Sequence, residues 1–122
     1  MTNQVVTQTP SVAPNNSAGI VNYSSGGFST DAGTAVAFSL SIGFKPRKFR
    51  LINLTGGGNG PIEYEWLDQM AAANSLTKTP GATNTFTVAQ NTSSLITVTD
   101  GGVTLAAGVM AASSAFVWEA FA

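Results

Sequence analysis

The sequence lacks two residue types on which much protein chemistry depends, because it contains no cysteine and no histidine. Without cysteine, neither disulfide bonds nor thiolate metal sites can form. Without histidine, Ser-His-Asp and Cys-His nucleophile systems are excluded, and the commonest ligand of transition metals is missing. We therefore expect a protein that is not an enzyme and that uses no cofactor and no metal.

Charged residues are also scarce. They make up 9% of the 122 residues, against about 25% in typical globular proteins, and the net charge at pH 7 is −1. Few surface charges give little protection against association, which favours a protein that packs against copies of itself or against a larger assembly. A near-neutral chain has no general attraction to nucleic acid or to acidic membranes, so we expect neither as a partner.

Long apolar runs are absent as well. No run approaches the roughly twenty residues that a membrane-spanning helix requires. The longest weakly polar stretch, residues 103–117, is interrupted by Gly108 and by serines. The N-terminal MTNQVVTQTP has neither the basic nor the apolar region of a secretory signal. We therefore expect a protein that is made in a cytoplasm and is not exported by a signal of its own.

The most informative stretch is residues 43–68, which hold seven of the eleven charged residues of the chain. Each half of this stretch alternates with the period of two that is typical of a β-strand. The faces of the first arm are predicted to carry Phe49, Leu51 and Asn53 on one side and Lys48, Arg50, Ile52 and Leu54 on the other. The faces of the second arm are predicted to carry Ile62, Tyr64 and Trp66 on one side and Glu63 and Glu65 on the other. Because the glycine-rich residues 55–61 lie between them, the stretch predicts a β-hairpin.

Opposite charges are divided between the two arms. The first arm carries the one basic cluster of the chain, formed by Lys45, Arg47, Lys48 and Arg50. If the arms pair antiparallel, these cations can face Glu63 and Glu65, and each exposed pair contributes about 0.2–1 kcal/mol. Three interpretations of the cluster stay open: pairing with the acidic arm, docking on an acidic protein surface, and nucleic-acid binding, which would require interleaved aromatic platforms.

Two features of the hairpin invite a catalytic or ligand-binding interpretation. Glu63 and Glu65 share one strand face, but a glycosidase normally draws its carboxylates from facing elements of a deep cleft, so we expect salt-bridge or solvated roles. The glycine-rich loop at residues 56–60 lacks the lysine and the serine or threonine of a phosphate-binding loop. We expect it to be a hairpin tip.

The rest of the chain predicts further short strands, which we expect at residues 19–23, 34–42, 76–79, 83–89, 95–99, 103–107 and 115–121. Residues 24–27 (SSGG) are expected to end the first, residues 67–75 to form a loop or single turn, and residues 100–102 (DGG) to close a hairpin. Strands at this spacing predict an antiparallel β-sandwich or small β-barrel. The polar residues 1–18 predict an extended N-terminal arm, which leaves residues 19–122 as a single β-domain.

The hairpin also carries a family resemblance. The order Gly43-Phe44-Lys45-Pro46-Arg47, then LINLT at residues 51–55, then Glu63-Tyr64-Glu65-Trp66-Leu67 with Met70-Ala71 after it, resembles small virion proteins of tailed bacteriophages. The resemblance covers residues 43–72 and, more loosely, residues 116–121. It implies a capsid decoration (cement) protein that binds the outside of the capsid and stabilises contacts between major capsid protein subunits.

The resemblance also implies a location, partners and contact residues. The protein would be synthesised in the host cytoplasm and lie on the outer capsid surface of the virion. Its partners would be the major capsid protein and copies of itself, as a homotrimer rather than a homodimer. The candidate residues for contact with the capsid or with other subunits are Lys45, Arg47, Lys48, Arg50, Val5 and Val6.

Two other functions stay open. The first is a structural component of a phage tail or baseplate. The second is a carbohydrate-binding module that uses Tyr64, Trp66 and Trp118 as stacking platforms. Core packing is the competing interpretation of Tyr64 and Trp66, because aromatic residues on one strand face usually fill a core.

Overall fold

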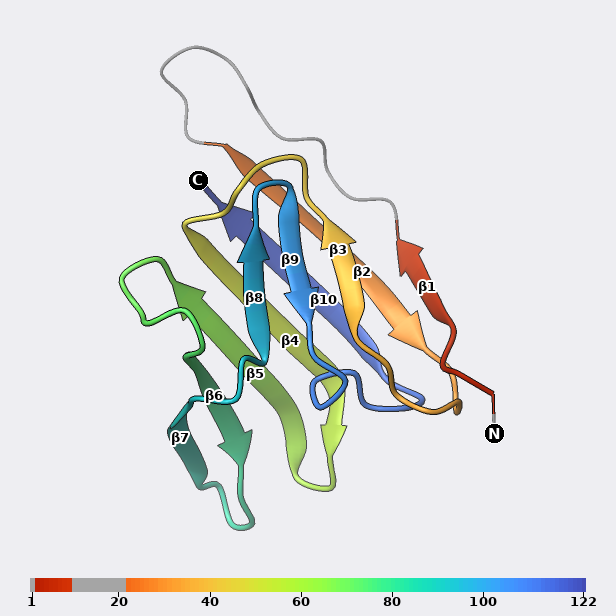
Figure 1. Cartoon of the computed structure of the whole chain (residues 1–122). Coiled ribbons are helices and arrows are strands. Elements are labelled where there is room, and N and C mark those ends of the chain that lie inside the picture. Colours follow the sequence, from red (N-terminus) through yellow and green to blue (C-terminus); the bar gives the residue numbers. More distant parts are fainter. Residues whose placement is uncertain (1, 10–21) are drawn as a thin grey trace.

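The computed structural model describes residues 2–9 and 22–122. This part of the chain forms β-strands and no helix (Figure 1). The strands are β1 (Val6–Thr9), β2 (Tyr23–Thr30), β3 (Phe38–Ser41), β4 (Lys48–Gly57), β5 (Gly60–Leu67), β6 (Ser75–Pro80), β7 (Phe86–Asn91), β8 (Ile96–Thr99), β9 (Gly102–Leu105) and β10 (Ala115–Phe121).

The strands form two sheets, and every pair of neighbouring strands within them is antiparallel. The large sheet has seven strands in the order β1-β2-β10-β4-β5-β6-β7, and the small sheet has three in the order β3-β9-β8. The small sheet lies over the middle of the large one (Figure 1). The prediction of an all-β antiparallel fold is confirmed, and the architecture is a sandwich that does not close into a barrel.

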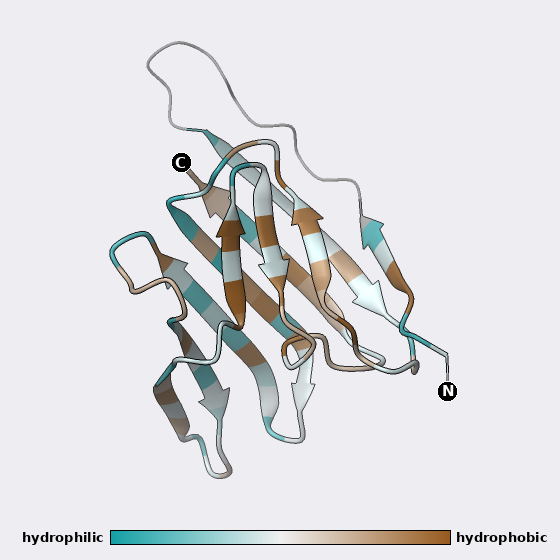
Figure 2. Ribbon diagram, in the orientation of Figure 1, coloured by the Kyte–Doolittle hydropathy of each residue, from teal (hydrophilic) through white to brown (hydrophobic). Residues whose placement is uncertain are grey.

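The core lies between the two sheets. The large sheet contributes mainly aromatic side chains, among them Phe28 and Phe116, whose stacked rings are 4.7 Å apart. The small sheet contributes aliphatic side chains at alternate positions, which Figure 2 shows as brown bands separated by pale ones. Val109 and Met110, in the loop before β10, are fully buried and belong to the same cluster.

The central hairpin forms as its alternation predicts. Phe49 and Leu51 on β4 are fully buried, and Tyr64 and Trp66 on β5 are buried on the same side. The strands extend further into the glycine-rich segment than expected, because a bulge shifts the register between residues 53 and 57. The buried Asn53 holds this bulge, since its Oδ1 accepts a hydrogen bond from the Gly56 amide at 2.9 Å.

The prediction that residues 24–27 end a strand is wrong, because all four lie inside β2. Gly26 and Gly27 are opposite Trp118 and Val117 of β10. Small residues at these positions leave space beside the larger side chains of the neighbouring strand. The remainder of the strand expected at residues 19–23 lies mostly outside the described residues.

Two other predicted strands begin three or four residues later than expected. The strand expected at residues 34–42 is reduced to β3, and Thr34 instead exchanges backbone hydrogen bonds with Thr2 and Gln4. The strand expected at residues 83–89 begins only at Phe86, because Thr83 and Asn84 have left-handed φ values of 64° and 59°. Such a conformation ends an extended strand and makes a turn.

The N-terminal residues that the structure describes lie on the sheet edge. Residues 6–9 form β1, which pairs with β2, and the buried Gln4 donates a hydrogen bond from Nε2 to the Met110 carbonyl at 3.0 Å. The Val5 amide donates to Asp31 Oδ1 at 3.0 Å, and the Asp31 amide donates back to the Val5 carbonyl. The rest of the predicted arm, from residue 10 onward, lies outside the described residues.

Candidate functional site

The outward face of the small sheet is entirely polar. Its strands direct only short hydroxyl side chains away from the core, from Ser39, Ser41, Thr97, Thr99 and Thr104. Ser39 and Thr104 are in hydrogen-bond contact across the ladder at 3.4 Å. A face of this kind is readily solvated and gains little by burial.

The outward face of the large sheet is different, and we call it the open face. Six large apolar side chains are exposed in the described residues, and five of them project from the open face: Leu54, Leu67, Phe86, Val88 and Val117. Ile52, Leu76 and Phe121 lie half-buried on the same face. Within residues 2–9 and 22–122, no further layer covers these side chains. Large apolar side chains that gather on one open sheet face, between charged ones, mark a candidate interaction surface.

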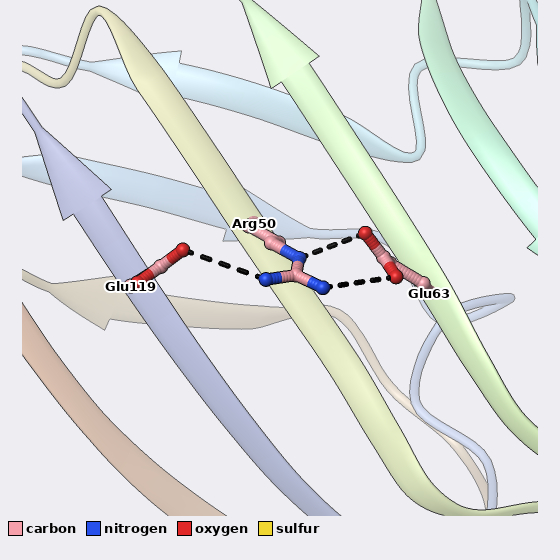
Figure 3. A network of polar contacts seen from close by, with 3 residues as sticks. All are labelled: Arg50, Glu63 and Glu119. Carbon is pink, nitrogen blue, oxygen red and sulfur yellow. Dashed lines mark hydrogen bonds and ion pairs between the residues drawn. The ribbon is translucent and has the colours of Figure 1, made fainter.

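A charge network lies at the centre of the open face (Figure 3). Arg50 on β4 donates from Nε to Glu63 Oε1 at 2.7 Å and from a terminal nitrogen to Glu63 Oε2 at 3.2 Å. Its other terminal nitrogen lies 3.7 Å from a carboxylate oxygen of Glu119 on β10. One cation therefore ties three neighbouring strands together on the solvent side.

This network shifts the pKa values of its members. The hydrogen bond from Arg50 holds the pKa of Glu63 below its ordinary value, and partial burial of the carboxyl opposes that effect. The same hydrogen bond raises the pKa of Arg50. Both groups therefore stay charged at neutral pH, and the predicted salt-bridge role of Glu63 is confirmed.

Beside the network lies an aromatic pair. The rings of Tyr23 and Phe121 are 4.9 Å apart, and the Lys48 ammonium lies 5.6 Å from the Phe121 centroid. Tyr23 also lines a shallow hollow of about 140 Å³ together with Ser25, Arg50 and Glu119. This end of the open face thus combines aromatic surface with charge.

The other two members of the basic cluster lie elsewhere. Lys45 and Arg47 precede β4 and line a groove of about 450 Å³, whose walls also include Trp66, Asp68, Met70 and Val98. Arg47 donates from Nε to Asp68 Oδ2 at 2.9 Å, and this bond lowers the pKa of Asp68. The groove is amphipathic, with an ion pair above an apolar floor.

The structure therefore separates the predicted contact residues into three places. Lys45 and Arg47 line the groove, whereas Lys48 and Arg50 lie on the open face. Val5 and Val6 lie at the edge of the large sheet near the end of β2, where Val5 is exposed and Val6 packs partly on the core. The pairing of Asp31 with the Val5 and Gly33 amides lowers the pKa of Asp31.

None of the five exposed apolar residues of the open face was identified from the sequence as a contact residue: Leu54, Leu67, Phe86, Val88 and Val117. Alternation does place Leu54 and Ile52 on the charged face of the first arm, which is a usable signal. This alternation does not identify Val117, Phe86 or Val88, because their place on the open face depends on the register of β10, β6 and β7.

The three aromatic residues suggested for sugar stacking all lie in the core. Tyr64 and Trp66 are each 8% exposed and Trp118 is 5% exposed. Burial also raises the pKa of the Tyr64 hydroxyl. The core-packing interpretation of Tyr64 and Trp66 is confirmed, and none of the three can offer a ring face to a sugar.

Comparisons with protein-family models, with curated proteins and with solved structures found no match for this chain. In the part of the chain that the structure describes, no helix could cross a membrane. The same residues contain no group of three or more acidic side chains placed to hold a metal ion. The open face and the groove beside Lys45 and Arg47 are therefore the features that bear on function.

Proposed function

We propose that the protein is a structural component of a tailed-phage virion that decorates the outside of the capsid. The observation that carries the proposal is the open face, which gathers five exposed large apolar side chains on one side of the large sheet. The resemblance of residues 43–72 to phage virion proteins directs this contact surface toward the major capsid protein. The role is mechanical and needs no active site, cofactor or metal.

The open face is suited to a protein partner because its central cation is already paired. Arg50 is bonded to Glu63 and lies near Glu119, so docking a partner there does not bury a lone cation. Burying an unpaired charge costs several kcal/mol, whereas apolar area contributes roughly 25 cal/mol per Å². The surrounding Leu54 and Val117 line a groove of about 460 Å³ that a capsid loop can enter.

Many identical contacts then add up on a capsid lattice. Each copy contributes a modest contact, and multivalency across the shell makes the whole coat stable. Closed symmetry favours homotrimers at local three-fold positions, with dimers at two-fold positions as the alternative. Neither nucleic acid nor membrane is a partner in this proposal.

The location of the protein in the virion tests the proposal. Virions of the phage that encodes the chain are separated into heads and tails, and each fraction is probed with an antibody and by peptide mass spectrometry. The proposal expects the protein in the head fraction, with antibody labelling on the outside of intact capsids. Finding it only in tails would assign it to the tail or baseplate, and finding it in neither would exclude a virion role.

A further inference from the structure

The strand β7 is an edge that the fold leaves unprotected. Five of its residues, Phe86 to Gln90, are exposed, on both faces of the sheet, and β7 pairs only with β6. The β6–β7 hairpin lies beyond the small sheet (Figure 1), so the second layer of the sandwich does not cover it. Every second residue of an edge strand directs its N–H and C=O groups away from the sheet, where another strand can bind them.

Natural edge strands are usually blocked by charge, proline or a bulge. None of these occurs in β7, whose sequence is FTVAQN and whose pairing with β6 runs without a register shift. Two of its side chains are also strongly apolar and exposed, since Phe86 is 60% and Val88 is 58% accessible. Both project from the open face, next to Lys78, whose ammonium lies 4.1 Å from the Phe86 ring centroid.

We propose that β7 pairs antiparallel with β7 of a second copy of this chain, with Thr87 on the two-fold axis. This register puts Phe86 of each copy opposite Val88 of the other, and aromatic–β-branched pairs are favourable across a ladder. It also brings the two Thr87 side chains together on the opposite face, which is another favourable pair. Centring the pair on Val88 would instead put Phe86 opposite Gln90.

The charges on and near β7 are also compatible with a second copy at this edge. β7 carries no charge, so no like charges meet across the new pair. The nearest cation is Lys78 on β6, directly opposite Val88. The backbones of the two Lys78 residues in a dimer would be at least three strand spacings, about 14 Å, apart, and each ammonium lies over the Phe86 ring of its own copy.

The pair is isologous, so it closes after two copies and does not continue into a longer assembly through β7. In this register only Phe86, Thr87 and Val88 of each copy lie opposite strand residues of the other, because residues 89–91 face residues 83–85, where the φ values of Thr83 and Asn84 are left-handed. This contact is small compared with the roughly 1,200 Å² of stable interfaces, and we expect a weak, reversible dimer. The inference does not depend on the capsid role. It uses neither β1 nor the centre of the open face, so the same contact can join two neighbouring trimers.

Single cysteines test the register, because the chain has none of its own. The Thr87→Cys variant is oxidised with copper phenanthroline and examined by non-reducing electrophoresis. The matched control is Thr79→Cys, which changes the exposed threonine directly opposite Thr87 on β6. In the proposed dimer the two Thr87 positions are within disulfide reach, whereas the two Thr79 positions are about 14 Å apart. We expect at least a tenfold higher dimer yield for Thr87→Cys.

Light scattering of the full chain, without added cysteines, tests the association itself. We expect the average mass of the unmodified chain to rise with concentration. The Val88→Lys variant should not show this rise, and an unchanged near-ultraviolet circular dichroism spectrum would show that it is still folded. Equal cross-linking of the two cysteine variants, or association that Val88→Lys leaves intact, would overturn the proposal. Protection of β7 amides only when capsid protein is added to a monomeric chain would also overturn it and would assign the edge to that partner.

Discussion

Arg50 donates two hydrogen bonds to Glu63, although the residue directly opposite it across the ladder is Glu65. The guanidinium reaches diagonally along β5, a geometry available to long side chains on one sheet face. This leaves its other terminal nitrogen directed toward Glu119 on the opposite neighbour, β10. The charges at the centre of the open face are thereby linked across three strands, and exposed apolar side chains lie on the same face.

The first prediction concerns this network. We expect Arg50→Ala to lower the free energy of unfolding by about 1 kcal/mol, because it removes a bidentate pair and leaves Glu63 and Glu119 without their shared cation. Lys48→Ala, on the same strand face, is the control and should change it by less than about 0.5 kcal/mol. Urea unfolding followed by tryptophan fluorescence measures both. Equal effects of the two variants would contradict the central role of Arg50.

The second prediction concerns pH. The pKa values of three carboxyl groups are lowered in the folded chain, those of Asp31, Glu63 and Asp68. Such a group stabilises the fold at pH values above its unfolded pKa, and the stabilisation is lost as the pH falls through the folded pKa. We expect a nearly constant free energy of unfolding from pH 7 to about pH 5 and a decline below about pH 4.

Two amide variants isolate the contribution of Glu63 to this pH dependence. Glu63→Gln should have a shallower decline in acid than the unmodified chain. Glu65 lies on the same strand face but makes no hydrogen bond in the network of Figure 3, so Glu65→Gln is the matched control, and of the two variants Glu63→Gln should have the shallower decline. An unchanged acid slope in Glu63→Gln would show that the pair with Arg50 does not contribute to stability.

The third prediction compares two phenylalanines. Phe49 is fully buried and stacks with Trp118 at 6.3 Å, whereas Phe86 is 60% exposed on β7. Phe49→Ala should lower the free energy of unfolding by about 3–5 kcal/mol because it leaves a cavity in the core. Phe86→Ala should change the stability of the monomer by less than about 1 kcal/mol. Thermal unfolding of both variants at low concentration checks the difference.

The fourth prediction compares two neighbouring glycines in the β8–β9 hairpin. A Cβ atom at Gly102 would lie 2.0 Å from the Leu40 carbonyl oxygen, whereas one at Gly101 would meet nothing within 4 Å. Gly102→Ala should therefore force β9 away from β3 and destabilise the small sheet by more than 2 kcal/mol, an order-of-magnitude expectation for backbone overpacking. Gly101→Ala should be nearly neutral. Comparable stabilities in urea would refute this account of the hairpin.

Local patterns predicted most of the fold because the alternation that marks a strand depends only on residues two positions apart. The alternation in β4 and β5 separated the two faces of the central hairpin, and residues 100–102 located the β8–β9 turn. The strand β1 has no such pattern, and its position depends on Gln4 reaching the distant Met110 carbonyl. The glycines of β2 resemble a turn until Trp118 is known to lie opposite them.

The candidate site was harder to predict because most of its apolar residues come from strands that are distant in the sequence. The ion pair between Arg50 and Glu63 joins two arms of one hairpin, so it follows from local sequence. The apolar part of the open face combines Leu54, Val117 and Phe86, which belong to three separate strands. Only the order and register of the seven-stranded sheet bring these residues to one surface.

The measurement that tests the central proposal most directly is binding to expanded, undecorated capsids of the phage that the proposal assigns the chain to, followed by co-sedimentation. We predict saturable binding of the unmodified chain and at least a tenfold loss of affinity for Leu54→Arg and for Val117→Arg, which place a charge on the open face. Ser41→Arg, which places the same charge on the polar face of the small sheet, should bind normally. Failure of the unmodified chain to bind, or normal binding by both open-face variants, would contradict the proposal.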